Sequence, residues 1–219
     1  MNAGIAKDPR FQTGDAGAVA RARADSARYP YVKADIDFMT GMIHHHAQAI
    51  YISRWAVANG ADAAVQRLTA RIINAQTDEI TLMQTWLKDR GQPVPVVDTS
   101  GTVTMPAAAG AAAGGHDMSA HMGHDMSAMG GMMMPGMLSD AQLKELEAAR
   151  GRDYDRLFLT YMILHHRGAV TMVKQLFVVD GAGQDETIFK FANDVEVDQS
   201  TEIKRMYTMM LERGWIPPQ

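Results

Sequence analysis

The chain has 219 residues, with no cysteine, 18 methionines, 8 histidines, a net charge of −4 and a pI near 6.0. A negative net charge is not typical of a nucleic-acid-binding protein, which usually carries a basic surface. No apolar run approaches the roughly 18 residues that span a membrane. Methionine offers a soft sulfur that needs no deprotonation, whereas cysteine forms disulfides in oxidising compartments. We therefore expect a periplasmic or secreted protein whose export signal is not present in this chain.

Turn and cap residues divide the chain into helices. We expect helical segments at residues 16–28, 31–58, 62–90, 139–179 and 185–213. Asn59-Gly60 and Gly91 end the second and third segments, because both provide the left-handed cap residue that helices favour. Ser139 to Gln142 resembles a capping box and opens the fourth segment, which we expect to bend at Gly151. No segment alternates with the period of a strand.

Two stretches of the sequence are copies of each other. Residues 35–46 return at 155–166, where Asp35, Phe38, Met42, Ile43, His45 and His46 match Asp155, Phe158, Met162, Ile163, His165 and His166. The repeat continues downstream, where Gln76, Glu79, Ile80, Met83, Arg90 and Gly91 match Gln199, Glu202, Ile203, Met206, Arg213 and Gly214. Packing explains a repeated phenylalanine or methionine, but it does not require two adjacent imidazoles at the same place in both halves.

Each half is predicted to be a helical hairpin, at about 31–91 and 139–215. A lone hairpin buries too little apolar surface to be stable, so we expect both to form a single four-helix-bundle domain over 1–219. The fold class is therefore all-α, with a long flexible Met/His-rich linker at about 92–138. We expect that residues 99–137 can be deleted without loss of the fold.

The linker contains a tract in which histidine and methionine alternate. It lacks branched aliphatic and aromatic residues and cannot build a core, but a plain spacer does not need this composition. The tract is predicted to hold metal ions as a flexible scavenger. Its candidate ligands are His116, Met118, His121, Met122, His124 and Met126.

Helical spacing predicts ordered metal sites in the bundle as well. Residues three and four apart share a helix face, so Asp35, Met39, Met42 and His46 form one stripe, and Met162 with His166 form its copy. The neighbouring His45 and His165 either join the margin of these sites or face the partner hairpin. Thioether and imidazole together suit Cu(I), and Ag(I) as its mimic, whereas zinc seldom uses methionine. Iron in helical bundles usually asks for Glu-x-x-His, which is absent.

Other roles compete with metal ligation. A methionine on an inner helix face is usually core filler, and a lone histidine there is usually hydrogen-bonded. Asp35 and Asp155 are either helix-start carboxylates or outer partners of imidazole N–H groups. Glu79 and Glu202 could serve the same outer role by approaching from the partner helices.

The motif Asp-x-x-Phe-x-x-x-Met-Ile-x-His-His and the Gln-x-x-Glu-Ile-x-x-Met segments resemble those of the domain-of-unknown-function family 305. Residues His166 to Met172 also resemble the family's His-x-Gly-Ala-x-x-Met ending, which adds Met172 to the candidate ligands. The first copy departs from this ending, with Ile52 in the place of the methionine. The resemblance implies a ferritin-like four-helix bundle, export from the cytoplasm, and copper or silver binding for tolerance.

Three functions remain open. The first is a binding protein, not an enzyme, that sequesters or shuttles Cu(I), Cu(II) or Ag(I) outside the cytoplasm. Its partners would be metal ions and other copper-transport or copper-resistance proteins, with no nucleic acid and no transmembrane segment. The second is a ferritin-like metal-dependent oxidase, which fold analogy alone does not support. The third is a structural or interaction bundle without metal.

Overall fold

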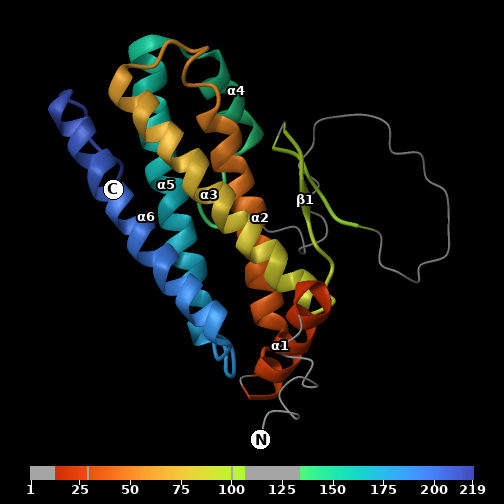
Figure 1. Cartoon of the computed structure of the whole chain (residues 1–219). Coiled ribbons are helices and arrows are strands. Elements are labelled where there is room, and N and C mark those ends of the chain that lie inside the picture. Colours follow the sequence, from red (N-terminus) through yellow and green to blue (C-terminus); the bar gives the residue numbers. More distant parts are fainter. Residues whose placement is uncertain (1–12, 29, 100, 107–133) are drawn as a thin grey trace, which may run out of the picture.

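Four long helices lie side by side in the computed structural model, which describes residues 13–28, 30–99, 101–106 and 134–219 (Figure 1). The elements are α1 (Gly14–Arg28), α2 (Lys33–Ser53), α3 (Ala63–Asp89), β1 (Val96–Val97), β2 (Val103–Thr104), α4 (Asp140–Ala148), α5 (Gly151–Val178) and α6 (Glu186–Glu212). Helices α2 and α3 form one hairpin, α5 and α6 form the other, and α2 packs on α5 between them. The predicted ferritin-like four-helix bundle is confirmed. None of the described helices has the length and apolar character of a membrane-spanning segment.

Helix α2 ends at Ser53, earlier than the expected residue 58, and turns occupy the next residues. The buried Asn59 explains the turns, because its side-chain nitrogen donates to the carbonyls of Leu146 and Glu147 at the end of α4. Its own carbonyl accepts from the backbone nitrogen of Gly151 at 2.7 Å. Asn59 thus joins the α2–α3 connection to the break between α4 and α5, and the expected bend near Gly151 is a break between two helices.

An aspartate caps the start of α3 and of α6, and each cap binds an arginine of the other hairpin. Asp62 accepts from the backbone nitrogens of Ala64 and Val65 and forms an ion pair with Arg213. Asp185 caps α6 in the same way and lies 2.5 Å from Arg90. Because Arg90 and Arg213 are repeat equivalents, the duplication produces two matched clamps between the hairpins.

Two apolar clusters fill the bundle, one toward each end. The first gathers the start of α2 and the end of α3 with the end of α5 and the start of α6, and includes Met42, Met83 and Phe191. The second gathers the opposite helix ends and includes Met162 and Met206. The repeated histidines lie at the level between the two clusters, as their position along α2 and α5 requires.

The segment expected to be flexible is packed on the bundle at both of its ends. Val96 and Val97 pair with Thr104 and Val103 in a short antiparallel hairpin that the sequence did not predict. Its turn brings Gly101 so close to Tyr51 that a Cβ on the glycine would lie 2.6 Å from the Cβ of Tyr51. At the other end, Met134 and Met137 are buried in the first cluster. The expected linker of 92–138 is therefore too wide, and the expectation that deleting 99–137 spares the fold loses its basis. The predicted tract ligands lie outside the described residues.

Residues 134–138, which we call the strap, are fastened to α2 and α5. Gln48 forms two hydrogen bonds with Leu138, donating to its carbonyl at 3.1 Å and accepting from its nitrogen at 2.7 Å. Gly136 has a φ of +78°, and a Cβ there would lie 2.5 Å from the carbonyl oxygen of Leu164. The strap therefore reaches the backbone of α5 only because this residue is glycine.

Replacing Gly168 by alanine should displace the strap. A Cβ at this helical position would lie 1.9 Å from the carbonyl oxygen of Pro135, so backbone must move. We expect a loss of about 1–3 kcal/mol in unfolding free energy, as for other overpacked sites, and faster amide exchange at 134–138. Denaturant unfolding and hydrogen exchange measure both, with the exposed Thr171→Ala on the same helix as the control. Unchanged stability and exchange would show that the strap is not seated on Gly168.

Candidate metal centre

Four imidazoles form a buried layer across the middle of the bundle. His45 and His46 come from α2, His165 and His166 come from α5, and all four are 0% exposed. The rings of His45 and His165 lie with their centroids 3.8 Å apart, inclined by 41°. Of the two positions left open by the sequence, these histidines therefore take the one that faces the partner hairpin.

Three of the histidines have an acceptor at Nε2. The Nε2 of His166 is hydrogen-bonded to Oε2 of Glu202 at 2.7 Å. The Nε2 of His46 lies at the same distance from Oε2 of Glu79, but the geometry of this contact is not that of a hydrogen bond. The Nε2 of His45 lies 3.0 Å from the carbonyl oxygen of Pro135 in the strap. A neutral imidazole that donates from Nε2 carries its lone pair on Nδ1. The predicted outer roles of Glu79 and Glu202 agree with this arrangement, since carboxylates orient metal-binding histidines in the same way.

The Nδ1 atoms of all four histidines are buried and have no hydrogen-bond partner among the described residues. A buried polar atom without a partner is costly, so its lone pair is available to a ligand. The pKa of His45 is lowered to about 3, mainly by burial and then by the proximity of His46, although the hydrogen bond with Pro135 acts in the opposite direction. Burial, and then the charge on His45, lower the pKa of His165 as well. Both imidazoles are therefore neutral at physiological pH.

The predicted methionine ligands are all buried on the inner faces of α2 and α5. Met39, Met42 and Met172 belong to the first apolar cluster, and Met162 belongs to the second. Met42 and Met162 lie one turn before His46 and His166, and helical side chains lean toward the preceding turn. Each of these two histidines therefore has a thioether on its own face. Met39 and Met172 lie farther along their helices from the histidines.

The structure assigns Asp35 and Asp155 to loop fastening. Asp35 accepts from the backbone nitrogens of Val32 at 2.8 Å and Gly183 at 2.7 Å. Asp155 accepts from the backbone nitrogen of Asp62 at 3.2 Å. The prediction that these two carboxylates are outer partners of the imidazoles is wrong. The helix-start alternative agrees with the structure for Asp35, which lies in the first turn of α2, whereas Asp155 follows the first turn of α5. Their duplication reflects the loop that each hairpin presents to the other.

A pocket of about 370 Å³ opens between α3 and α6 beside the histidine layer. It is lined by Gln76, Glu79, Asp198, Gln199 and Glu202, among others, so the two carboxylates that touch His46 and His166 also face this pocket. Burial, and then the charges of nearby carboxylates, raise the pKa of Asp198. Sequence reasoning used the two glutamines only as repeat markers and missed Asp198. The Gln-x-x-Glu spacing was the available signal, because it places each glutamine on the face of its glutamate.

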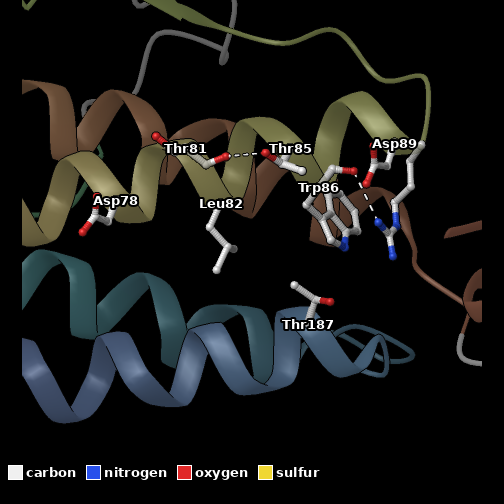
Figure 2. Close-up of a pocket in the computed structure, with 8 residues that line it drawn as sticks. Asp78, Thr81, Leu82, Thr85, Trp86, Asp89 and Thr187 are labelled. Atoms are coloured by element: carbon white, nitrogen blue, oxygen red, sulfur yellow. Dashed lines mark hydrogen bonds between the residues drawn. The ribbon is translucent and has the colours of Figure 1, made fainter. Parts of the chain in front are cut away.

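A second pocket, of about 400 Å³, lies between the end of α3 and the start of α6. Figure 2 shows Leu82 and Thr187 pointing toward each other across it, with Trp86 at one side. Thr85 and Arg90 donate to the carbonyls of Thr81 and Trp86. None of the predicted metal ligands lines this pocket. In the described part of the chain, the histidine layer included, no three His, Asp or Glu side chains gather as a set that could hold an ion by themselves.

These features define a duplicated helical bundle with a buried layer of imidazole and thioether side chains. The family model described as "Domain of unknown function (DUF305)" matches residues 35–210. The chain belongs to this family. A 56-residue stretch is also 38% identical to the uncharacterized protein L153 of Acanthamoeba polyphaga mimivirus, and it spans 26% of this chain and 37% of that relative's length.

Several solved structures have the same fold. A family protein from Streptomyces coelicolor is 27% identical, with a TM-score of 0.64 over 85% of this chain and 97% of its own. The copper protein CopM in its Cu(II)-bound form is 26% identical, with a TM-score of 0.54 over 80% of this chain and 94% of its own. CopM in its Cu(I)-bound form is 24% identical, with a TM-score of 0.55 over 81% of this chain and 96% of its own, and supports the fold alone.

Proposed function

We propose that this chain is an extracytoplasmic copper-binding protein that sequesters or shuttles the ion and so confers resistance. The observation that carries the proposal is the state of His46 and His166. Each is fully buried, with a glutamate at Nε2 and an Nδ1 atom that has no partner among the described residues. A thioether lies one turn earlier on the same helix face in both copies. The arrangement therefore offers a soft sulfur and an oriented imidazole nitrogen twice.

This donor pair favours Cu(I) and Ag(I), because both are soft and accept low coordination numbers. Met42 with His46 would hold one ion, and Met162 with His166 would hold the other. Bound copper would replace the missing partners of Nδ1, while Glu79 and Glu202 keep the rings in the orientation that aims this atom inward. The chemistry that copper would supply here is reversible coordination, and the similarity to the Cu(II)-bound CopM structure supports copper as the ion.

The Met/His-rich tract and the compartment complete the proposal. His116, His121 and His124, with the methionines between them, would capture further ions by composition alone. An oxidising compartment suits a chain with 18 methionines and no cysteine, and the description of the Streptomyces coelicolor protein suggests that it is secreted. We expect metal ions and other copper-transport or copper-resistance proteins as partners.

The runner-up is a metal-dependent oxidase, and the proposal assigns no enzymatic activity. Glu79 and Glu202 lie at the outer nitrogens of their histidines, so they act on the rings and not as direct carboxylate ligands. An oxidase centre of the bundle type draws its glutamates and histidines to the ions themselves. Oxygen consumption by the copper-loaded chain, faster than by free copper, would favour the oxidase.

Competition with chelators tests the choice of metal. The purified chain should bind Cu(I) and Ag(I) more tightly than Zn(II), because thioethers favour soft ions and zinc rarely accepts them. A control chain removes the tract ligands by changing its three histidines to asparagine and Met118, Met122, Met126, Met129, Met132 and Met133 to serine. We call this variant the silenced chain. It should still bind Cu(I) and Ag(I) more tightly than Zn(II), but with fewer ions per chain. Zn(II) binding as tight as that of Cu(I), or tighter, would contradict the soft-metal proposal.

A further inference from the structure

We propose that Gln76 and Gln199 supply oxygen ligands to the buried layer and extend its range to Cu(II), an inference that rests on the proposed function. The two glutamines are 2% and 3% exposed, although both line the pocket between α3 and α6. The Oε1 of each is buried and has no hydrogen-bond partner among the described residues. The same unusual state at two equivalent positions points to a shared role.

The balance of hydrogen-bond donors and acceptors in the histidine layer indicates what these oxygens would bind. Nε2 of His166 donates to Glu202 and Nε2 of His45 donates to the carbonyl of Pro135, so the unpartnered Nδ1 atoms of these two rings are acceptors. Both ring nitrogens of His46 lack a hydrogen-bond partner among the described residues, and a neutral imidazole always offers one lone pair. The amide oxygens are acceptors as well, as are the thioether sulfurs. Acceptors cannot pair with one another, whereas a cation would satisfy several of them at once. Three carboxylates, Glu79, Asp198 and Glu202, line the pocket against one guanidinium, that of Arg71, which lies 3.6 Å from Glu202. A cation would offset the remaining negative charge.

The position of each glutamine allows it to share an ion with its histidine. Gln76 lies one turn before Glu79 on α3, and Gln199 lies one turn before Glu202 on α6. Since residues three apart share a helix face, the glutamine faces the same layer as the glutamate that touches the imidazole. Imidazole nitrogen and amide oxygen together suit Cu(II), whereas thioether and imidazole suit Cu(I). Each half of the bundle would then hold copper in either oxidation state by changing the partner of the same Nδ1 atom.

The test compares two ions in the silenced chain, since its tract offers no imidazole to Cu(II). In Gln76→Leu/Gln199→Leu, we expect at least a tenfold loss of Cu(II) affinity, while Ag(I) affinity stays within twofold. Competition titrations measure both ions, and the electron paramagnetic resonance spectrum of bound Cu(II) should change with the loss of the oxygen ligand. Gln175→Leu, on the exposed face of α5, is the matched control and should leave both affinities unchanged.

The other outcomes separate this inference from the proposed function. Unchanged Cu(II) affinity in the double variant overturns the inference and leaves the soft-metal proposal standing. An equal loss of Cu(II) and Ag(I) also overturns it, because the glutamines would then only support the layer. If the silenced chain binds neither ion before any glutamine is changed, the proposed metal sites of the bundle fail, and binding by the unchanged chain alone would assign the metal to the tract. Should the leucine variant not fold, Gln76→Glu/Gln199→Glu retains the oxygen, and loss of Cu(II) binding there overturns the inference.

Discussion

Replacing Asp185 by alanine should lower the unfolding free energy by about 3–5 kcal/mol, the range for breaking a buried ion pair. The side chain of Asp185 is 1% exposed and that of Arg90 is 6% exposed. The same carboxylate accepts from Trp86 at 3.1 Å and caps α6 through the nitrogens of Thr187 and Ile188. Alanine would therefore remove a cap and leave a buried guanidinium without its partner. Urea unfolding followed by circular dichroism measures the change.

The repeat supplies a matched control for this prediction. Asp62 caps α3 and pairs with Arg213 in the same way, but its side chain is 39% exposed and that of Arg213 is 19% exposed. We expect Asp62→Ala to cost about 1–2 kcal/mol, mostly from the lost cap. The exposed pair of Lys33 and Asp37 should contribute less than about 1 kcal/mol. Equal losses at Asp62 and Asp185 would show that burial does not distinguish the two clamps.

The fold could be predicted from the sequence because the duplication fixes it. A motif that occurs twice, followed twice by Gln-x-x-Glu, indicates two equivalent hairpins, and two hairpins bury their faces as a bundle. The caps at Asp62, Ser139 and Asp185 come from local chemistry and lie within a few residues of the predicted helix starts. The early end of α2 was missed because it depends on Asn59 contacting α4, and α4 is distant in the sequence.

The candidate site was only partly predictable, for a related reason. Helical spacing places Met42 and His46 on one face, and the structure agrees with that spacing. It cannot indicate what lies opposite each ring, so the contacts of Glu79 and Glu202 with Nε2 remained one alternative among several. The roles of Asp35 and Asp155 were misassigned because their partners are backbone nitrogens of loops. The strap was taken for linker because its burial depends on Gly136 and Gly168, and close approach between glycines leaves no mark in composition.

The largest expected effect on metal binding comes from Met42→Leu with Met162→Leu in the silenced chain. Both methionines are 0% exposed. Leucine has a similar volume, so each swap should cost less than about 1.5 kcal/mol of stability. Leucine offers no lone pair, however, and each site would lose its sulfur. Affinity for Cu(I) should therefore fall by more than the roughly 10- to 100-fold that follows the loss of an outer partner.

Met83→Leu with Met206→Leu is the matched control for this pair. These two methionines are also repeat equivalents and are also 0% exposed, and they belong to the same two apolar clusters. They lie on α3 and α6, which carry no histidine among the described residues. Their replacement should leave Cu(I) affinity within about twofold of the silenced chain. A loss in both double variants would indicate repacking of the core instead of a missing ligand.

The measurement that tests the account most directly is the Cu(I) affinity of the silenced chain with and without Met42 and Met162, determined by chelator competition. We predict that the silenced chain binds Cu(I) tightly and that Met42→Leu/Met162→Leu loses this affinity while its denaturant midpoint barely moves. Unchanged Cu(I) affinity and stoichiometry in the double variant would contradict the account. Cu(I) would then be bound by other residues of the bundle, and Met42 and Met162 would only fill the core.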